Sequence, residues 1–204
     1  MSMDAAAGAP GADADLAPEE SARLARLRRL LDGAGVPYRI LAHESTVVTA
    51  QMGVERGFGR LEEMAPTLIL QSERGLLAAI VSGQSRLSYR KIKKELGLKD
   101  VSFAGAETVR AATGAEVGTV SLVNEGLQTI VDARLAGVEA VFGGCGVPRH
   151  TLHIRTPDLI AVTGAQVFDF TAPRNDGAPP TAPAAPDGAG SRRPAAGAPV
   201  PRNR

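Results

Sequence analysis

The residues best suited to chemistry lie in two small-residue loops. Gly143, Gly144 and Gly146 place three glycines within four positions, and the stretch 118–121 reads Gly-Thr-Val-Ser. Glycine permits positive φ and lets another group approach the main chain closely. Both loops can therefore present backbone N–H and C=O groups to a ligand. An isolated glycine turn is more often architectural, so spacing alone leaves a plain hairpin open as the alternative.

Side-chain catalysis has much weaker support. The sequence contains no HExxH, paired CxxC, P-loop or GxSxG motif, and no GxGxxG between a strand and a helix. The only cysteine, Cys145, has no evident base nearby and is expected to be a small buried thiol. His43, His150 and His153 lack metal-ligand spacing, and we interpret His153 as a packed or hydrogen-bonded strand histidine. We therefore expect no metal and no cofactor.

The composition gives no indication of a nucleic-acid or membrane partner. The 204 residues carry a formal charge of only +1, so no global field indicates a nucleic-acid or membrane partner. Aromatic residues make up 3% and tryptophan is absent, which argues against stacking platforms for single-stranded nucleic acid. A single cysteine fits a reducing compartment. We see no signal peptide and no membrane-spanning run, and we expect a cytoplasmic protein.

The two loops must be positioned by a mixture of helices and strands. The patterns predict helices over 18–32, 47–54, 89–96, 106–112 and 157–163, and strands over 38–42, 67–70, 76–81, 101–103, 129–132, 138–142, 151–154 and 167–170. The strands 67–70 and 76–81 are expected to form a hairpin, and Gly97, Gly114 and Gly164 to end three of the helices. Thr156 is expected to cap the last helix, with Pro157 at its first position. No regular βαβ repeat is present. The fold class is therefore α/β of the α+β type, a single domain with a mixed, largely antiparallel central sheet flanked by helices.

The chain divides into a folded domain and two tails. Residues 1–17 are rich in Ala, Gly and Asp, and residues 172–204 are rich in Pro, Ala and Gly. Both tails lack the large apolar groups that offset ordering entropy, so we expect them to be disordered and the domain to span 18–171. Within that domain Lys91, Lys93 and Lys94 form a basic helix face. This face is a candidate tRNA contact, and a merely solvated face is an equal alternative.

The order of these pieces resembles the YbaK/EbsC family, the editing domain associated with prolyl-tRNA synthetase. The resemblance covers roughly residues 24–170. It rests on His43 followed by Thr49 and on five stretches in the family's order, which read TLIL, SGQSRLSYRKIKKELGLKDVSFA, GAEVGTVS, TIVDARL and GG-CG with RTPDLIAVTGA. Each motif alone is weak, and their shared order carries the assignment.

This resemblance implies trans-editing, the hydrolysis of the ester that joins a wrong amino acid, typically a small one, to tRNA-Pro. Gly118 and Ser121 would belong to the catalytic loop, which positions a water through backbone groups. His43, Thr49, Gly143 and Gly144 would line the substrate pocket. The implied partners are the acceptor end of an aminoacyl-tRNA and prolyl-tRNA synthetase. Such chemistry needs positioning and oxyanion stabilisation more than a strong nucleophile.

The chain departs from the family pattern at two positions. Pro66 stands where the family has a lysine that contacts a phosphate of the terminal nucleotide, and Leu122 stands where its Gly-x-x-x-Pro loop has proline. A cation such as Arg56, Arg60 or the 91–94 helix would have to replace the lysine. An alternative is an inactive relative that binds a charged tRNA end, an amino acid or a protein partner. A plain structural domain is a third. We favour the deacylase, because such pockets rest largely on backbone groups.

Overall fold

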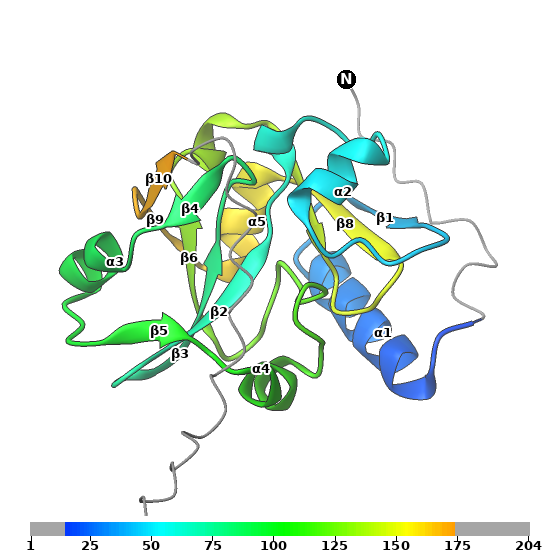
Figure 1. Ribbon diagram of the computed structural model, residues 1–204. Helices are drawn as coiled ribbons and strands as arrows, with labels where there is room; N and C mark the ends of the chain where they lie inside the picture. Colours follow the sequence, from blue (N-terminus) through cyan, green and yellow to red (C-terminus); the bar gives the residue numbers. More distant parts are fainter. Residues whose placement is uncertain (1–14, 174–204) are drawn as a thin grey trace, which may run out of the picture.

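The computed structural model describes residues 15–173, which form ten strands in three sheets with five α-helices around them (Figure 1). The predicted tails lie almost entirely outside the described residues. Five of the seven strand pairings are antiparallel and two are parallel. The predicted class, a mixed and largely antiparallel α+β domain, is confirmed, although its strands divide among three sheets.

A three-stranded sheet carries the glycine turn. Its order is β1-β8-β7, with both pairings antiparallel. The strands are β1 (Tyr38–Ala42), β7 (Ala140–Gly144) and β8 (His150–Arg155). Helix α1 (Pro18–Gly33) begins with Pro18 in its first turn, as predicted. Gly35, with φ of 65°, takes the left-handed conformation after this helix.

A five-stranded sheet forms the other half of the molecule, in the order β5-β2-β3-β6-β9. Its strands are β2 (Thr67–Ser72), β3 (Gly75–Ile80), β5 (Val101–Phe103), β6 (Gln128–Asp132) and β9 (Gln166–Phe168). The predicted hairpin of β2 and β3 is present, and its register pairs Ser72 with Gly75. The parallel pairings are those of β6 with β3 and with β9.

A short ribbon and the remaining helices complete the domain. The ribbon, in which β4 (Ser85–Leu87) pairs with β10 (Thr171–Pro173), was not predicted from the sequence. The helices are α2 (Ala50–Glu55), α3 (Tyr89–Leu96), α4 (Ala106–Thr113) and α5 (Thr156–Thr163), with single 3-10 turns η1 (Leu61–Glu63) and η2 (Leu135–Gly137). Helices α3, α4 and α5 each end at a left-handed glycine, as predicted.

One cap was predicted wrongly. The N-cap of α5 is Arg155, and Thr156 is the first helical residue. The side chain of Thr156 is 1% exposed and its hydroxyl makes no hydrogen bond to a described residue. The backbone enters the helix one residue earlier than the Thr-Pro pattern suggests, because β8 runs directly into α5 without a loop.

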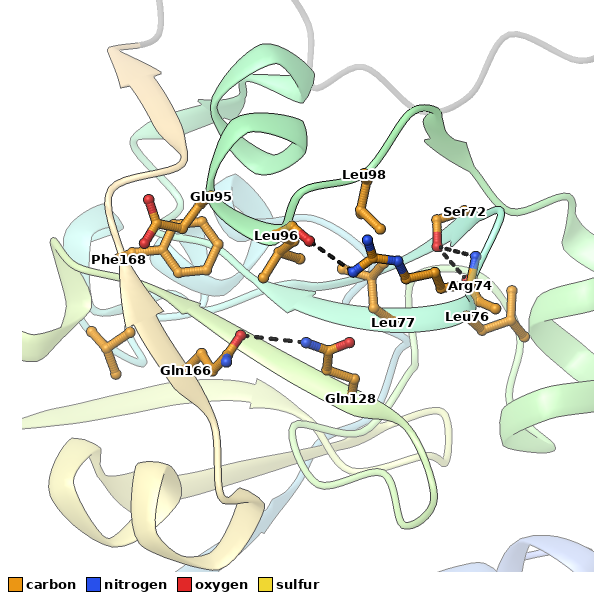
Figure 2. A pocket seen from close by; sticks show the side chains of 12 residues that line it. Ser72, Arg74, Leu76, Leu77, Glu95, Leu96, Leu98, Gln128, Gln166 and Phe168 are labelled. Atoms are coloured by element: carbon orange, nitrogen blue, oxygen red, sulfur yellow. Dashed lines mark hydrogen bonds between the residues drawn. The ribbon is translucent and has the colours of Figure 1, made fainter.

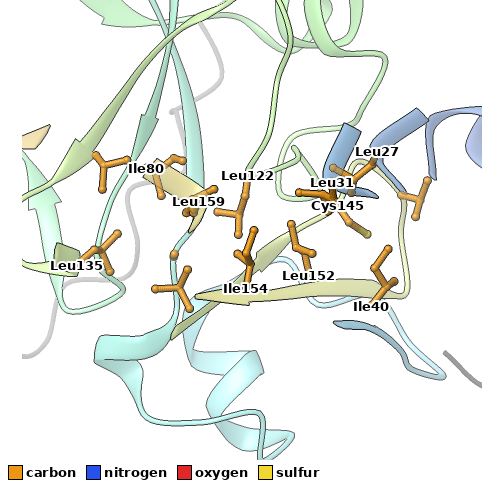
Figure 3. Packing of buried hydrophobic residues seen from close by; sticks show 14 of the residues in the cluster. Leu27, Leu31, Ile40, Ile80, Leu122, Leu135, Cys145, Leu152, Ile154 and Leu159 are labelled. Atoms are coloured by element: carbon orange, nitrogen blue, oxygen red, sulfur yellow. The ribbon is translucent and has the colours of Figure 1, made fainter. Parts of the chain in front are cut away.

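Aliphatic side chains fill the core, as a sequence without tryptophan requires (Figure 3). Leu31 from α1, Ile154 from β8 and Leu159 from α5 are fully buried in the largest cluster. Leu122 belongs to the same cluster and is also fully buried, so the loop after Ser121 is anchored in the core. Burying such a side chain contributes about 1.5–3 kcal/mol, which fixes the loop against the three-stranded sheet.

Candidate functional site

Three of the predicted segments converge on one cavity of about 60 Å³. Thr49, Gly118, Gly143 and Gly144 all line it. The wall also includes Val47, Val48, Ala50, Gly53, Phe58, Met64, Ala65, Pro66, Thr119, Phe142, Val147, Arg149, His150 and Thr151. The cavity therefore lies between α2, the end of β7, the turn into β8 and the 118–121 loop.

Gly143 and Gly144 are required by close packing against that loop. A Cβ on Gly144 would lie 2.1 Å from the carbonyl oxygen of Val120, and one on Gly143 would lie 2.6 Å from Leu122 Cδ2. The backbone N–H of Leu122 donates to the carbonyl oxygen of Gly144 at 2.9 Å. A proline at position 122 could not make this bond. Leu122 thus fastens the loop to β7 through an N–H that the family's proline lacks.

Gly118 lines the cavity next to Val48. Its φ is 93°, a conformation that side chains rarely adopt, and a Cβ would lie 3.0 Å from Cβ of Val48. The next residue, Thr119, is held by a bond of 2.9 Å from the N–H of Gly146 to its carbonyl oxygen. Among residues 15–173, the N–H of Gly118 donates to none. It remains available to a ligand.

Ser121 does not line the cavity. Its hydroxyl accepts from the N–H of Val123 at 3.1 Å, and its carbonyl oxygen accepts from the side chain of Asn124 at 2.6 Å. The residue is 8% exposed. The structure therefore places Ser121 behind the wall, where it shapes the turn that holds Gly118.

Thr49 lines the cavity, whereas His43 does not. Thr49 caps α2, because its hydroxyl oxygen accepts from the N–H of Met52 at 3.2 Å. His43 lies behind the wall and reaches the cavity through Thr151. Its Nδ1 lies 2.7 Å from the carbonyl oxygen of Ser45, an acceptor, so Nδ1 carries the proton. Nε2 then accepts from the Thr151 hydroxyl at 3.1 Å, which leaves the oxygen lone pairs of Thr151 for the cavity.

Burial favours the neutral form of His43 by lowering its pKa. Desolvation lowers its pKa below the ordinary 6.5, and repulsion from Arg56 and Arg149 lowers it further, against the opposing hydrogen bond to Ser45. Desolvation also lowers the pKa of His153. The neutral form is the one that the contact to Thr151 needs, since imidazolium has no acceptor nitrogen.

Two phenylalanines and two histidines form a row of ring contacts beside this cavity. The ring centroids of His43 and Phe58 are 5.5 Å apart, those of Phe58 and Phe142 are 6.0 Å apart, and those of Phe142 and His153 are 4.1 Å apart. The sequence placed no aromatic cluster here, because these rings are far apart in the chain. His153 is packed against a ring, as predicted for a strand histidine.

The cation at this site was not among those suggested from the sequence. Pro66 does lie in the cavity wall, and Arg149 lines the cavity from the turn between β7 and β8. The guanidinium of Arg56 donates to the hydroxyl of Ser45, and that of Arg60 is 2.7 Å from Glu62. Both of these suggested replacements are therefore engaged elsewhere.

The lysine face lies on the other side of the molecule. Helix α3 packs beside β4 and β5, whereas α2 and β8 lie at the opposite end (Figure 1). Lys91 donates to Asp169 at 2.7 Å and to the carbonyl oxygen of Thr171 at 2.7 Å. Lys91, Lys93 and Lys94 do not line the cavity. A contact from this helix to a more distant part of a tRNA stays a prediction.

A larger concavity, of about 560 Å³, opens beside the five-stranded sheet (Figure 2). Arg74 crosses it and donates to the carbonyl oxygens of Leu96 at 3.0 Å and Gly97 at 2.8 Å. Gln128 and Gln166 are hydrogen-bonded to each other at 3.3 Å. None of the predicted site residues lines this concavity, so its size alone does not make it the site.

Two further properties follow from the described residues. Residues 15–173 contain no group of three His, Cys, Asp or Glu side chains placed to hold a metal ion. None of the helices described combines the length and the apolar character that crossing a membrane requires.

Known proteins similar to this chain point to one family. A sequence profile of the aminoacyl-tRNA editing domain matches residues 42–162. A proline–tRNA ligase of Pelotomaculum thermopropionicum is 34% identical over 90 residues, which are 43% of this chain and 16% of the ligase. A proline–tRNA ligase of Moorella thermoacetica is 31% identical over 112 residues, 54% of this chain and 18% of the ligase. The chain thus spans less than a fifth of these ligases.

Solved structures agree over nearly their full lengths. The crystal structure of a proposed trans-editing enzyme for prolyl tRNA synthetase has a TM-score of 0.68 and 26% identity, covering 78% of this chain and 99% of that one. A hypothetical protein has the same TM-score and identity, with 72% and 99% covered. The resemblance read from the motifs is confirmed. The chain belongs to the aminoacyl-tRNA editing domain family, and the enzyme class that this membership supports is aminoacyl-tRNA deacylase.

Proposed function

We propose that the chain removes a small, wrongly attached amino acid from tRNA, with tRNA-Pro as the first candidate. The observation that carries the proposal is the convergence of Thr49, Gly118 and the Gly143–Gly144 turn on one cavity. The similarity to proline–tRNA ligases and to a proposed trans-editing enzyme supports the choice of tRNA. Editing is needed because a synthetase pocket rejects a substrate smaller by one methylene by only about 1–3 kcal/mol.

The cavity favours a small aminoacyl group. Its volume of about 60 Å³ is far below the roughly 300–1,000 Å³ of ordinary ligand pockets. Its walls are mostly apolar, with Val147 and Met64 almost fully buried. A side chain the size of alanine or cysteine fits such a space better than a long or branched one.

Backbone groups supply the chemistry in this proposal. The unengaged N–H of Gly118 can donate to the oxyanion that forms when water attacks the ester carbonyl. The Thr151 oxygen, whose proton is directed to His43, can accept a hydrogen bond from the ribose or the amino group. Cys145 is 1% exposed and does not line the cavity, so the proposal needs no covalent nucleophile.

The test is hydrolysis of a panel of charged tRNAs by the purified protein. Ala- and Cys-charged tRNA-Pro should lose their amino acid, and tRNAs charged with leucine or another large residue should persist. If no member is hydrolysed above the uncatalysed rate while the protein still binds tRNA, the chain is the binding-only relative instead.

Two exposed valines provide a matched pair of variants. Val48 is 48% exposed and lines the cavity, whereas Val117 is 44% exposed and does not. A Val48→Phe side chain should narrow the entrance and lower the deacylation rate, and Val117→Phe should leave it unchanged. Both variants should keep the thermal stability of the parent, because neither site is buried. Equal activity of the two variants would mean that this cavity is not where the ester is cleaved.

A further inference from the structure

We propose that Arg149 binds a backbone phosphate of the charged tRNA end at the mouth of the small cavity. The inference rests on the proposed function and adds to it the residue that recognises the nucleic-acid part of the substrate. The ester lies on the terminal ribose, so an aminoacyl group inside the cavity leaves the neighbouring phosphate outside it, within reach of a partly exposed residue of the wall such as Arg149.

The backbone of Arg149 is held in an unusual conformation. Its φ is 60°, and it is the only residue other than glycine with positive φ among residues 15–173. Its carbonyl oxygen accepts from the N–H of His43 at 2.8 Å, which fixes the turn against the end of β1. Left-handed backbone is costly for a residue with a Cβ, and strain of this kind is concentrated at functional sites.

The guanidinium of Arg149 has no partner among the described residues. No carboxylate or carbonyl group of residues 15–173 is hydrogen-bonded to it or forms an ion pair with it. Most of the other described arginines form hydrogen bonds or ion pairs within the protein. Arg23 donates to the carbonyl oxygen of Gly146, and Arg134 contacts Asp132 and Asp169. An unpaired guanidinium in a cavity wall offers its planar set of donors to an anion.

The surroundings favour an anion of the nucleic acid over another ligand. The wall contains no lysine and no carboxylate, and Pro66 contributes neither charge nor N–H. Arg149 is the only arginine or lysine among the described residues that line the cavity. An aminoacyl-tRNA brings a free ammonium and no carboxylate to this site, which leaves the phosphodiester as its anion.

The first experiment varies both the enzyme and the substrate. Wild type, Arg149→Gln and Arg149→Lys are each assayed on charged tRNA and on 3′-O-aminoacyl adenosine, which has the ester and the ribose but no phosphate. On charged tRNA, Arg149→Gln should lower kcat/KM about 10- to 100-fold, mainly through KM, and Arg149→Lys should lose less. On the phosphate-free ester the three proteins should be alike. An equal loss on both substrates would overturn the assignment.

The second experiment measures the dependence of KM for charged tRNA on salt. Removing one phosphate contact should reduce the slope of log KM against log salt by about 0.7–0.9. Arg86→Gln is the matched control, because Arg86 is an exposed arginine on β4 that does not line the cavity. An unchanged slope for Arg149→Gln would also overturn the assignment. Failure of the proposed function is separate, since wild type would then hydrolyse neither substrate.

Discussion

The two concavities differ in whether their polar groups have hydrogen-bond partners within the protein. The larger one, of about 560 Å³, has Arg74 bonded to two carbonyl oxygens at the end of α3 and two glutamines bonded to each other. The smaller one, of about 60 Å³, has the Gly118 N–H and the Arg149 guanidinium without partners among the described residues. The smaller concavity therefore has more polar groups available for a ligand than the larger one.

A physical reason accounts for this difference. A cation at the C-terminal end of a helix satisfies carbonyl groups that have no partner within the helix, so Arg74 has a structural role. Arg149 lies beyond the end of β7, in a turn that the fold holds in a left-handed conformation without using its side chain. Strain together with an unpaired charge distinguishes a binding site from a surface depression.

The largest expected effect comes from breaking the wall of the smaller cavity. In Gly144→Ala the new Cβ would lie 2.1 Å from the carbonyl oxygen of Val120 and 3.0 Å from that of Thr119. Backbone cannot move aside as a flexible side chain does, so we expect a loss of about 3 kcal/mol or more in the free energy of unfolding. Deacylation should be lost as well. Denaturant unfolding and the tRNA assay measure the two effects.

Gly33→Ala is the control for that substitution. Nothing lies within 4 Å of its Cβ position, and its φ is not positive. Alanine is the better helix former, so the variant should be as stable as the parent or up to about 1 kcal/mol more stable. If Gly144→Ala behaves like Gly33→Ala, the close contact between β7 and the loop does not exist in solution.

Much of the fold could be predicted from local patterns. The β2–β3 hairpin, the helix ends at Gly97, Gly114 and Gly164, and the limits of β1 follow from apolar alternation and from glycine after a helix. The β4–β10 ribbon was missed, because three-residue strands carry too little periodicity. The Thr156 cap was wrong because a strand can enter a helix without a loop.

The site was predictable mainly where a close approach of two backbone segments requires glycine. Gly118, Gly143 and Gly144 are in the wall, and their residue type reflects the close contacts that exclude a Cβ. Ser121 was predicted from its place in the loop, yet its side chain turns into that loop. Arg149 gave no signal, because arginine is not a residue that normally marks positive φ. The contact of His43 with Thr151 joins residues that are 108 positions apart, which no local pattern can reveal.

The same substitution, arginine to glutamine, can be made in each of the two concavities. Arg74→Gln removes two bonds from an exposed side chain, so it should lower the free energy of unfolding by about 0.5–1 kcal/mol and leave deacylation intact. Arg149→Gln should do the reverse, with lower activity and unchanged stability. The measurements are thermal unfolding and the initial rate of deacylation on the same preparations. Loss of activity in Arg74→Gln would give the larger concavity a role in editing.

Arg149→Gly separates strain from charge. Glycine adopts a φ of 60° without steric cost, so the free energy of unfolding should stay level or rise by up to about 1 kcal/mol while activity falls. Urea unfolding beside the tRNA assay is the measurement. A variant that is both less stable and less active would mean that the arginine holds the turn together, and that its conformation is not a constraint retained for binding.

The smallest expected effect is a dependence on pH that arises from two histidines behind the wall of the smaller cavity. Desolvation lowers the pKa of His43 and of His153 in the folded state, while the unfolded chain keeps values near 6.5. Above that pH both states are neutral and their difference vanishes. As the pH falls through about 6.5, the unfolded chain takes up protons first, so the free energy of unfolding should decline until the folded histidines also titrate.

Hydrogen exchange at about pH 5.5 and about pH 7.5, corrected for intrinsic rates, should locate this decline. Protection should fall in β8, which carries Thr151 and His153, more than in β3 and β6 beside the larger concavity, whose lining contains no histidine. The double variant His43→Gln with His153→Gln should flatten the pH dependence of unfolding. If that variant loses stability on acidification as steeply as the parent, the acid sensitivity comes from carboxylates elsewhere, and the smaller cavity does not respond to pH through its histidines.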